Sequence, residues 1–192
     1  MVSGLLYRLG TDMALSRITN GGVASSGLPS GSIIQVQRTQ FTGVRTITHS
    51  ANTDTVVSDL TVNITPISTS SIIRIDGFVQ GEFDHINNQT DGVWFFFRDS
   101  TKLAHPVTGN RKVGINMGTN ITYYDANASS TPEGCFYTYF DTPSSTSQIT
   151  YKVAFDARTA GDWYLNHTVT DSTNNDYNER GISSITVTEI AG

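Results

Sequence analysis

The stretches Ile149–Phe155 (ITYKVAF) and Ile182–Ile190 (ISSITVTEI) decide the fold class. In the first stretch every second residue is apolar, so the apolar side chains share one face. This period of two is typical of a half-buried β-strand. The second stretch places Ile185 and Val187 on one face and closes the sequence. Such a strand needs a sheet formed by earlier residues, and the rest of the chain is expected to supply it.

Further strand-like runs recur from Ser32 onward, separated by turn signals. Gly92–Arg98 (GVWFFFR) is apolar on both faces, which predicts a central strand buried on both sides. Cys135–Phe140 (CFYTYF) places its phenylalanines on one face and its tyrosines on the other. The other predicted strands are Ile33–Phe41, Val44–Thr48, Asp59–Thr65, Ile72–Val79, Thr101–Val107, Arg111–Met117, Asn120–Tyr124 and Asp162–Thr168. We therefore predict an all-β, antiparallel, jelly-roll-like β-sandwich of about 9–10 strands, with a closed barrel as the alternative.

Several segments between the predicted strands carry turn signals. Gly81–Thr90 and Thr170–Gly181 are polar and are predicted to be loops, and Gly77 indicates a β-bulge. The pattern T-P-x-S-T-S-x-I occurs twice, at Thr65–Ile72 and Thr142–Ile149. It is either a duplicated unit or one turn used twice, in which proline fixes φ and hydroxyls close the turn on the backbone. We favour the repeated turn.

Composition limits the classes of partner. The chain has 192 residues, enough for one domain with a full core. Only 15% of the residues are charged, while 27 Thr and 20 Ser provide a polar, nearly uncharged surface. The net charge is -5 and no basic cluster occurs, which argues against nucleic-acid binding. No apolar run approaches the ~20 residues of a membrane span, and no signal peptide is recognisable, so no membrane partner is expected.

Residues 1–30 differ from the rest of the chain and are predicted to form an N-terminal arm and flexible joint, with the sandwich domain over residues 31–192. Ordering a backbone costs about 1–2 kcal/mol per residue, and burying an apolar side chain returns about 1.5–3 kcal/mol. The arm has too few apolar residues to order itself, so we expect it to need a partner surface. Folding back on its own domain is the alternative. The predicted partner-binding residues are Leu5, Leu6, Tyr7, Leu9, Met13, Leu15 and Ile18.

No recognised catalytic motif occurs, and we expect neither enzymatic activity nor a cofactor. Glu82, Asp84 and Asp91 share one predicted loop, followed by Asp99, so they could supply the paired carboxylates of a glycosidase. Solvated acids are the favoured interpretation. Cys135 is a single cysteine in an aromatic run, which is typical of a small buried hydrophobic residue.

Two other groups of residues suggest ligands more weakly. Asp171–Glu179 (DSTNNDYNE) is rich in the oxygen ligands that calcium prefers, but it departs from the EF-hand pattern, so a solvated turn is favoured. Trp94 and Trp163 could stack on sugar rings if exposed, but both lie in strand patterns, which favours core packing. The histidines show no metal-binding spacing and are expected to have surface or hydrogen-bonding roles; they are His49, His85, His105 and His167.

A family resemblance is carried by a series of short motifs. In order they are GSIIQVQ after a Gly/Ser/Pro joint, TPISTSSIIRI, FRDSTKL, FDTPSSTSQITYKVAF, YLNHT and the closing ERGISSITVTEIAG. From about Gly31 to Gly192 the chain resembles β-rich virion proteins of tailed bacteriophages, especially those of marine and cyanobacterial hosts. The resemblance implies a domain on the particle surface, often a trimer, attached through its N-terminal stretch. It brings no catalytic residues.

The arm and the resemblance together predict a capsid decoration (cement) protein. Such a protein is made in the host cytoplasm and located on the virion, where its arm lies along the shell and its sandwich covers seams between capsomers. Its expected partners are the major capsid protein or other virion proteins and copies of itself, as a homotrimer. The alternative is a short tail-fibre or receptor-binding protein that recognises host-surface glycans. The sequence has no fibrous shaft repeat, which favours the capsid.

Overall fold

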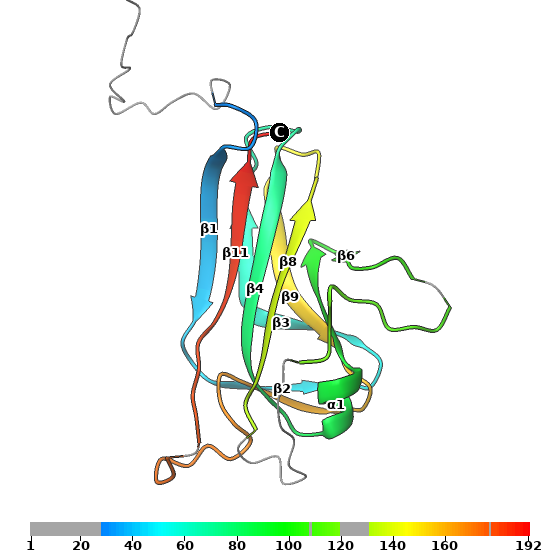
Figure 1. Ribbon diagram of the computed structural model, residues 1–192, viewed down its shortest axis with the longest axis vertical. Helices are drawn as coiled ribbons and strands as arrows, with labels where there is room; N and C mark the ends of the chain where they lie inside the picture. The colour runs from blue at the N-terminus through cyan, green and yellow to red at the C-terminus, as the bar shows by residue number, and fades with distance from the viewer. Residues whose placement is uncertain (1–27, 108, 120–130, 177) are drawn as a thin grey trace, which may run out of the picture.

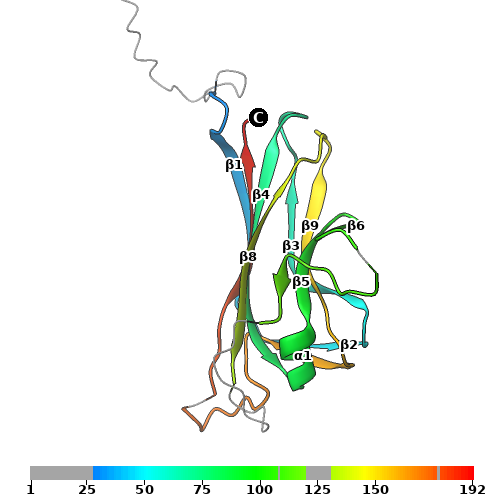
Figure 2. The same ribbon diagram turned by 45° about the vertical axis from the view of Figure 1, so that its right-hand side comes forward.

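The computed structural model describes residues 28–107, 109–119, 131–176 and 178–192 (Figure 1). In these residues the chain forms eleven β-strands and one short helix. The strands make two antiparallel sheets that face each other, as the turned view in Figure 2 shows. The predicted all-β sandwich is therefore confirmed.

The first sheet, sheet A, has the strand order β1-β11-β4-β10-β2, and β8 pairs with β4. Its strands are β1 (Ile33–Phe41), β2 (Arg45–His49), β4 (Ile72–Phe83), β8 (Glu133–Asp141), β10 (Gly161–Leu165) and β11 (Ser183–Ile190). The closing strand β11 lies between β1 and β4, so earlier residues do supply the sheet that it joins.

The second sheet, sheet B, has the order β3-β9-β5-β6, and β7 pairs with β5. Its strands are β3 (Asp54–Ile64), β5 (Val93–Arg98), β6 (Thr101–Leu103), β7 (Asn116–Met117) and β9 (Ile149–Asp156). The strands of six or more residues alternate between the two sheets along the chain; they are β1, β3, β4, β5, β8, β9 and β11. This wrapped connectivity is that of a jelly-roll-like sandwich.

The core lies between the sheets and has an aromatic centre. Trp94 and Trp163 are 1% and 0% exposed, with ring centroids 5.3 Å apart. Phe83 packs against both tryptophans, and Phe155 packs against Trp94. Edge-to-face and tilted ring contacts add to the hydrophobic gain from burial. Core packing of both tryptophans is confirmed, so neither offers a platform for a sugar ring.

Strand β5 is buried on both faces, as its sequence predicts. Trp94 and Phe96 point into the main core, whereas Phe95 belongs to a second apolar cluster on the outer side of sheet B. Ala104 and Ile115, from the segment between β6 and β7, cover that cluster.

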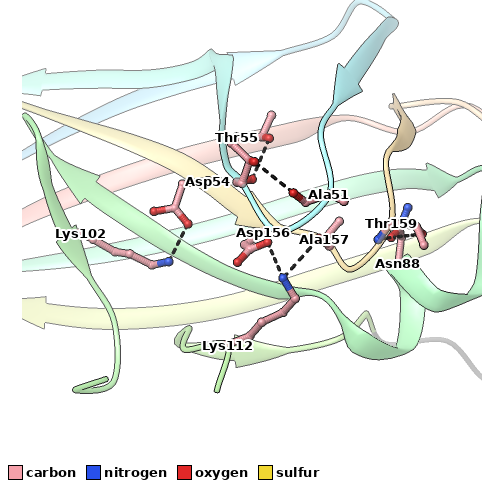
Figure 3. Close-up of polar contacts among 10 residues, drawn as sticks. Ala51, Asp54, Thr55, Asn88, Lys102, Lys112, Asp156, Ala157 and Thr159 are labelled. Carbon is pink, nitrogen blue, oxygen red and sulfur yellow. Dashed lines mark hydrogen bonds and ion pairs between the residues drawn. The ribbon is translucent and has the colours of Figure 1, made fainter. Parts of the chain in front are cut away.

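Lysines from β6 and the β6–β7 segment reinforce this cover, as Figure 3 shows. Lys112 Nζ donates to Asp156 at 2.6 Å and to the carbonyl of Ala157, and Lys102 Nζ donates to Asp54 at 2.7 Å. The Lys102 ammonium also lies 3.8 Å from the ring centroid of Phe95, which favours a cation–π contact. The chain thus covers the Phe95 cluster on the outer face of sheet B with its own residues.

The prediction of a loop over Gly81–Thr90 is wrong. Strand β4 continues to Phe83, and Ile86–Asp91 form helix α1, where His85 Nδ1 accepts a hydrogen bond from Asn87 N. The helix is fixed by Asn88, whose Oδ1 accepts from Thr159 N at 2.9 Å (Figure 3). A single polar turn has no apolar periodicity, so its tertiary contacts decide the conformation.

The predicted bulge at Gly77 is also wrong, because this residue pairs in regular register with both β11 and β8. A side chain here would meet the rings of Phe96 and Tyr137 at 3.1 Å, so glycine makes room for core packing. The predicted strands Thr101–Val107 and Arg111–Met117 shorten to β6 and β7. Asn120–Tyr124 lies outside the described residues.

The two copies of the octapeptide share one hydrogen bond from the backbone to a hydroxyl, although their backbones differ: Ser144 has φ +52°, and the matching Ile67 has no positive φ. Ser68 Oγ accepts a hydrogen bond from Ser70 N at 3.2 Å, and the matching Ser145 Oγ accepts from Ser147 N at 3.1 Å. Each copy then leads into a strand, β4 or β9. Hydroxyls closing a turn on the backbone explain the repeat.

Candidate functional site

One end of the sandwich holds both the beginning of the described chain and its last residues (Figure 1). Gly31 N donates to the carbonyl of Ala191 at 2.8 Å, and Ala191 N donates to the carbonyl of Ser32 at 2.8 Å. Gly31 has φ +87°, a conformation that favours glycine. The residues that precede β1 therefore join the domain at a fixed point. The seven predicted arm residues lie outside the described part of the chain.

A hollow of about 380 Å³ lies at this end, between Leu28, Ile34, Ile67 and the closing Ala191–Gly192. The buried carboxylate of Glu189 organises the loop that borders it. It accepts hydrogen bonds from Ile67 N at 2.7 Å, Ser71 Oγ at 2.6 Å and Gln35 Nε2 at 2.6 Å. This end is thus both apolar in part and rigidly held.

The outer face of sheet A carries exposed aromatic side chains on β4 and β8. Phe136 and Phe140 are 60% and 58% exposed, and Phe78 is 38% exposed, with its ring 6.4 Å from that of Phe136. We call these three residues the aromatic face. Exposed apolar groups that lie together on one face are typical of contact surfaces. Other residues of the chain cover the outer aromatic residues of sheet B, whereas those of sheet A are exposed. The aromatic face is therefore a stronger candidate for a contact surface than the outer face of sheet B.

The acidic residues considered for a glycosidase pair each have structural partners in the chain. The Glu82 carboxylate is fully buried and accepts from Thr131 N at 3.1 Å and Val169 N at 2.7 Å. Asp84 accepts from Asp162 N, whereas Asp91 pairs with Arg158. Each carboxylate is therefore used to hold a different part of the chain.

Asp99 holds a turn beside β9. It has φ +52°, and its Oδ1 accepts a hydrogen bond from Thr150 N at 3.0 Å. Its backbone N–H in turn donates to the carbonyl of Thr150 at 2.8 Å. This pair of contacts gives Asp99 a structural role.

Asp171, the first residue of the possible calcium loop, is bound to an arginine. Arg180 donates to its two oxygens at 2.9 and 2.6 Å, and this hydrogen bonding lowers the pKa of the Asp171 carboxyl. The residues that the structure describes contain no group of three or more His, Cys, Asp and Glu side chains that could hold a metal ion. The pair of Asp171 and Arg180 closes this loop within the chain.

Cys135 is 2% exposed, and burial raises the pKa of its thiol well above the ordinary value. Asn116 Nδ2 donates to its Sγ at 3.4 Å. A buried neutral thiol is a poor nucleophile, because the thiolate is the reactive form. Its setting agrees with the role of a small buried hydrophobic residue.

His49 lies inside the aromatic core, where burial lowers its pKa although Asp84, Asp162 and Asp156 act in the opposite direction. Its ring packs edge-to-face on Phe83 and Phe155 at 5.7 and 5.2 Å. The unfolded chain therefore binds a proton at a higher pH than the folded chain does. Stability is complete above the ordinary histidine pKa and falls as the pH drops through it, until the folded-state pKa is reached.

We expect urea unfolding between pH 7 and pH 5 to show this loss, by at most about 1.4 kcal/mol per pH unit. His49→Phe should remove that part of the pH dependence, whereas His105→Phe, at an exposed position, should retain it. Parallel stability curves for the wild type and the His49 variant would contradict the assignment.

No family model and no curated protein matches the sequence. Within the described ranges, no helix is both long and apolar enough to cross a membrane.

Proposed function

We propose that this chain is a structural protein of a bacteriophage particle, specifically a capsid decoration (cement) protein on the virion surface. Its N-terminal arm attaches to the major capsid protein and its sandwich covers seams between capsomers. One observation supports this proposal most: the chain enters the sandwich at an end fixed by reciprocal backbone hydrogen bonds between residues 31–32 and Ala191. A segment bound to a shell would therefore hold the whole domain in a defined position.

The arm and the folded domain have different roles in binding, and the difference has a physical reason. A domain that is already folded adds no ordering cost when it binds, so the cost falls on the arm and on the contact itself. The apolar residues of the arm, including Leu5, Leu6 and Leu9, can be buried against the shell to offset that cost. The uncharged, hydroxyl-rich surface of the domain then remains in solvent. Copies of the chain would act together, as the trimer of the resembling proteins implies.

Removal of residues 1–30 tests the proposal. The remaining domain should unfold cooperatively at nearly the same temperature as the full chain, because its core is intact. It should show no binding to shells that lack this protein, measured by co-sedimentation. Full binding by the shortened chain would contradict attachment through the arm.

A matched variant separates loss of the apolar contacts from loss of length. Leu5→Ser, Leu6→Ser and Leu9→Ser together retain all residues but remove three large apolar side chains. Their loss should weaken shell binding at least tenfold, since each side chain contributes about 1.5–3 kcal/mol when fully buried. Unchanged affinity would show that the arm does not bind through its apolar side chains.

A further inference from the structure

Strand β8 forms an exposed edge of sheet A with unusual properties. It pairs with β4 over nine consecutive positions, from Gly81↔Glu133 to Ile73↔Asp141, with no register shift. No other strand in the described residues pairs with it. Between Glu133 and Asp141 the strand has no charged residue and no proline. Natural edge strands usually carry such features, or a bulge, to prevent pairing with another chain.

The sequence of this edge is symmetric. Residues 136–140 read Phe-Tyr-Thr-Tyr-Phe, a palindrome centred on Thr138. A two-fold contact places the same surface of each copy against the other, so the surface must complement itself. We propose that β8 pairs antiparallel with β8 of a second copy, about a two-fold axis at Thr138, and joins two A sheets into one.

In this register each residue lies opposite its symmetric counterpart. Phe136 lies opposite the partner subunit's Phe140, and Phe140 lies opposite the partner subunit's Phe136. Directly opposed aromatic residues stabilise a strand pair. Because Phe78 already contacts Phe136, the aromatic faces of the two copies would form one continuous cluster across the axis. Thr138 lies opposite its own copy, where a larger side chain would crowd the axis.

The charges near the edge do not oppose this contact, although each chain carries a net charge of -5. Asp76, beside Thr138 on β4, accepts from Arg74 at 3.0 Å and from Thr138 Oγ1 at 2.6 Å. Asp141, at the end of β8, is paired with Arg98 at 2.9 Å. Both acids are therefore paired within one copy, and residues 134–140 of the meeting strands carry no charge of their own. This charge pattern favours a second copy over a charged partner.

A single cysteine tests the register on the full-length protein. Opposed Cα atoms in an antiparallel pair lie about 4.5–5.5 Å apart, within the range of a disulfide. Thr138→Cys should therefore form a covalent pair under mild oxidation, seen as a doubled mass on a non-reducing gel. Phe136→Cys is the control, since its two copies would lie about 13 Å apart in this register. Native Cys135 is buried and should not interfere.

Charge substitutions test the same pairing by sedimentation. In F136K/F140K, each of the two symmetric pairs of positions 136 and 140 places one lysine opposite another. The like charges repel, so self-association should be lost. In F136K/F140E, each lysine lies opposite a glutamate, so association should return and weaken with added salt. Val36→Lys, on β1 at the other edge of sheet A, is the matched surface control and should associate as the wild type does.

Failure to cross-link through position 138 at any protein concentration, or equal cross-linking through 136, would overturn the two-fold contact. Equal association of both charge variants would also overturn it. These experiments use the protein alone, so their outcome is independent of shell binding. The two-fold contact joins copies in pairs and is therefore a different contact from the three-fold one of the proposed trimer.

Discussion

Replacement of Glu189 by alanine is expected to lower the free energy of unfolding by roughly 3–5 kcal/mol, because three donors lose a charged acceptor. The Glu189 carboxylate is fully buried and joins β11 to β1 and to the loop before β4. Buried donors without a partner pay their full desolvation cost. The loss should also loosen the end of the sandwich where the chain enters.

Urea unfolding followed by tryptophan fluorescence measures this effect. Glu179→Ala is the control: this residue is exposed, and its loss should change the stability by less than about 0.5 kcal/mol. Glu189→Gln keeps the shape of the side chain but presents an amide to three donors. Its free energy of unfolding should lie between those of the control and the alanine variant. A Glu189→Ala protein as stable as the control would show that the carboxylate does not hold this end together.

Replacement of Gly81 by alanine is expected to destabilise the sandwich by about 3 kcal/mol or more, near the upper end of the range for overpacking. At Gly81, strand β4 meets both β8 and β10. A Cβ atom here would lie 2.2 Å from the carbonyl oxygen of Tyr164 and 2.7 Å from the Trp163 ring. A backbone atom cannot move away as a side chain can, so the pairing of β4 with β10 must open.

Gly134→Ala is the matched control, because Gly134 pairs with the neighbouring Gln80 and a Cβ atom there meets nothing nearer than 3.8 Å. It should be neutral or slightly stabilising, since glycine is unfavourable inside a strand. Thermal unfolding by circular dichroism compares the two. If both variants unfold at the same temperature, the close approach at Gly81 is not a requirement of the fold.

The sequence predicted the architecture well where side-chain periodicity reports burial directly. The alternation in β9 and β11 identified their buried faces, and the continuous apolar run of β5 identified a strand covered on both sides. These patterns are local, and one buried face is enough to produce them. The extra length of β4, which continues to Phe83, was missed because Gln80, Gly81 and Glu82 are polar or glycine, although Gly81 and Glu82 are buried.

The polar residues that hold the sandwich together were not predictable. Glu189 bonds residues more than one hundred positions away, and Glu82 bonds residues 131 and 169. Asn166 has φ +65° and joins the carbonyls of Phe41 and Gly43 to the hydroxyl of Ser183. Such contacts depend on which strands become neighbours, and a single sequence does not reveal that order.

The candidate contact surfaces were predicted only in part. The alternation in CFYTYF separated the phenylalanines from the tyrosines, and the structure shows that the phenylalanines face outward while Tyr137 is buried. Which of two apolar faces enters a core depends on the opposing sheet, so periodicity alone could not decide it. The arm residues stay a prediction from sequence.

A density map of the bacteriophage particle to which the proposal assigns this chain tests the proposed function most directly. We predict sandwich-shaped density on the outer surface of the shell, over seams between capsomers, with residues 1–30 lying along the major capsid protein. Density for the chain at the tail alone would favour the receptor-binding alternative and contradict the decoration function. Absence of the chain from purified particles would contradict both.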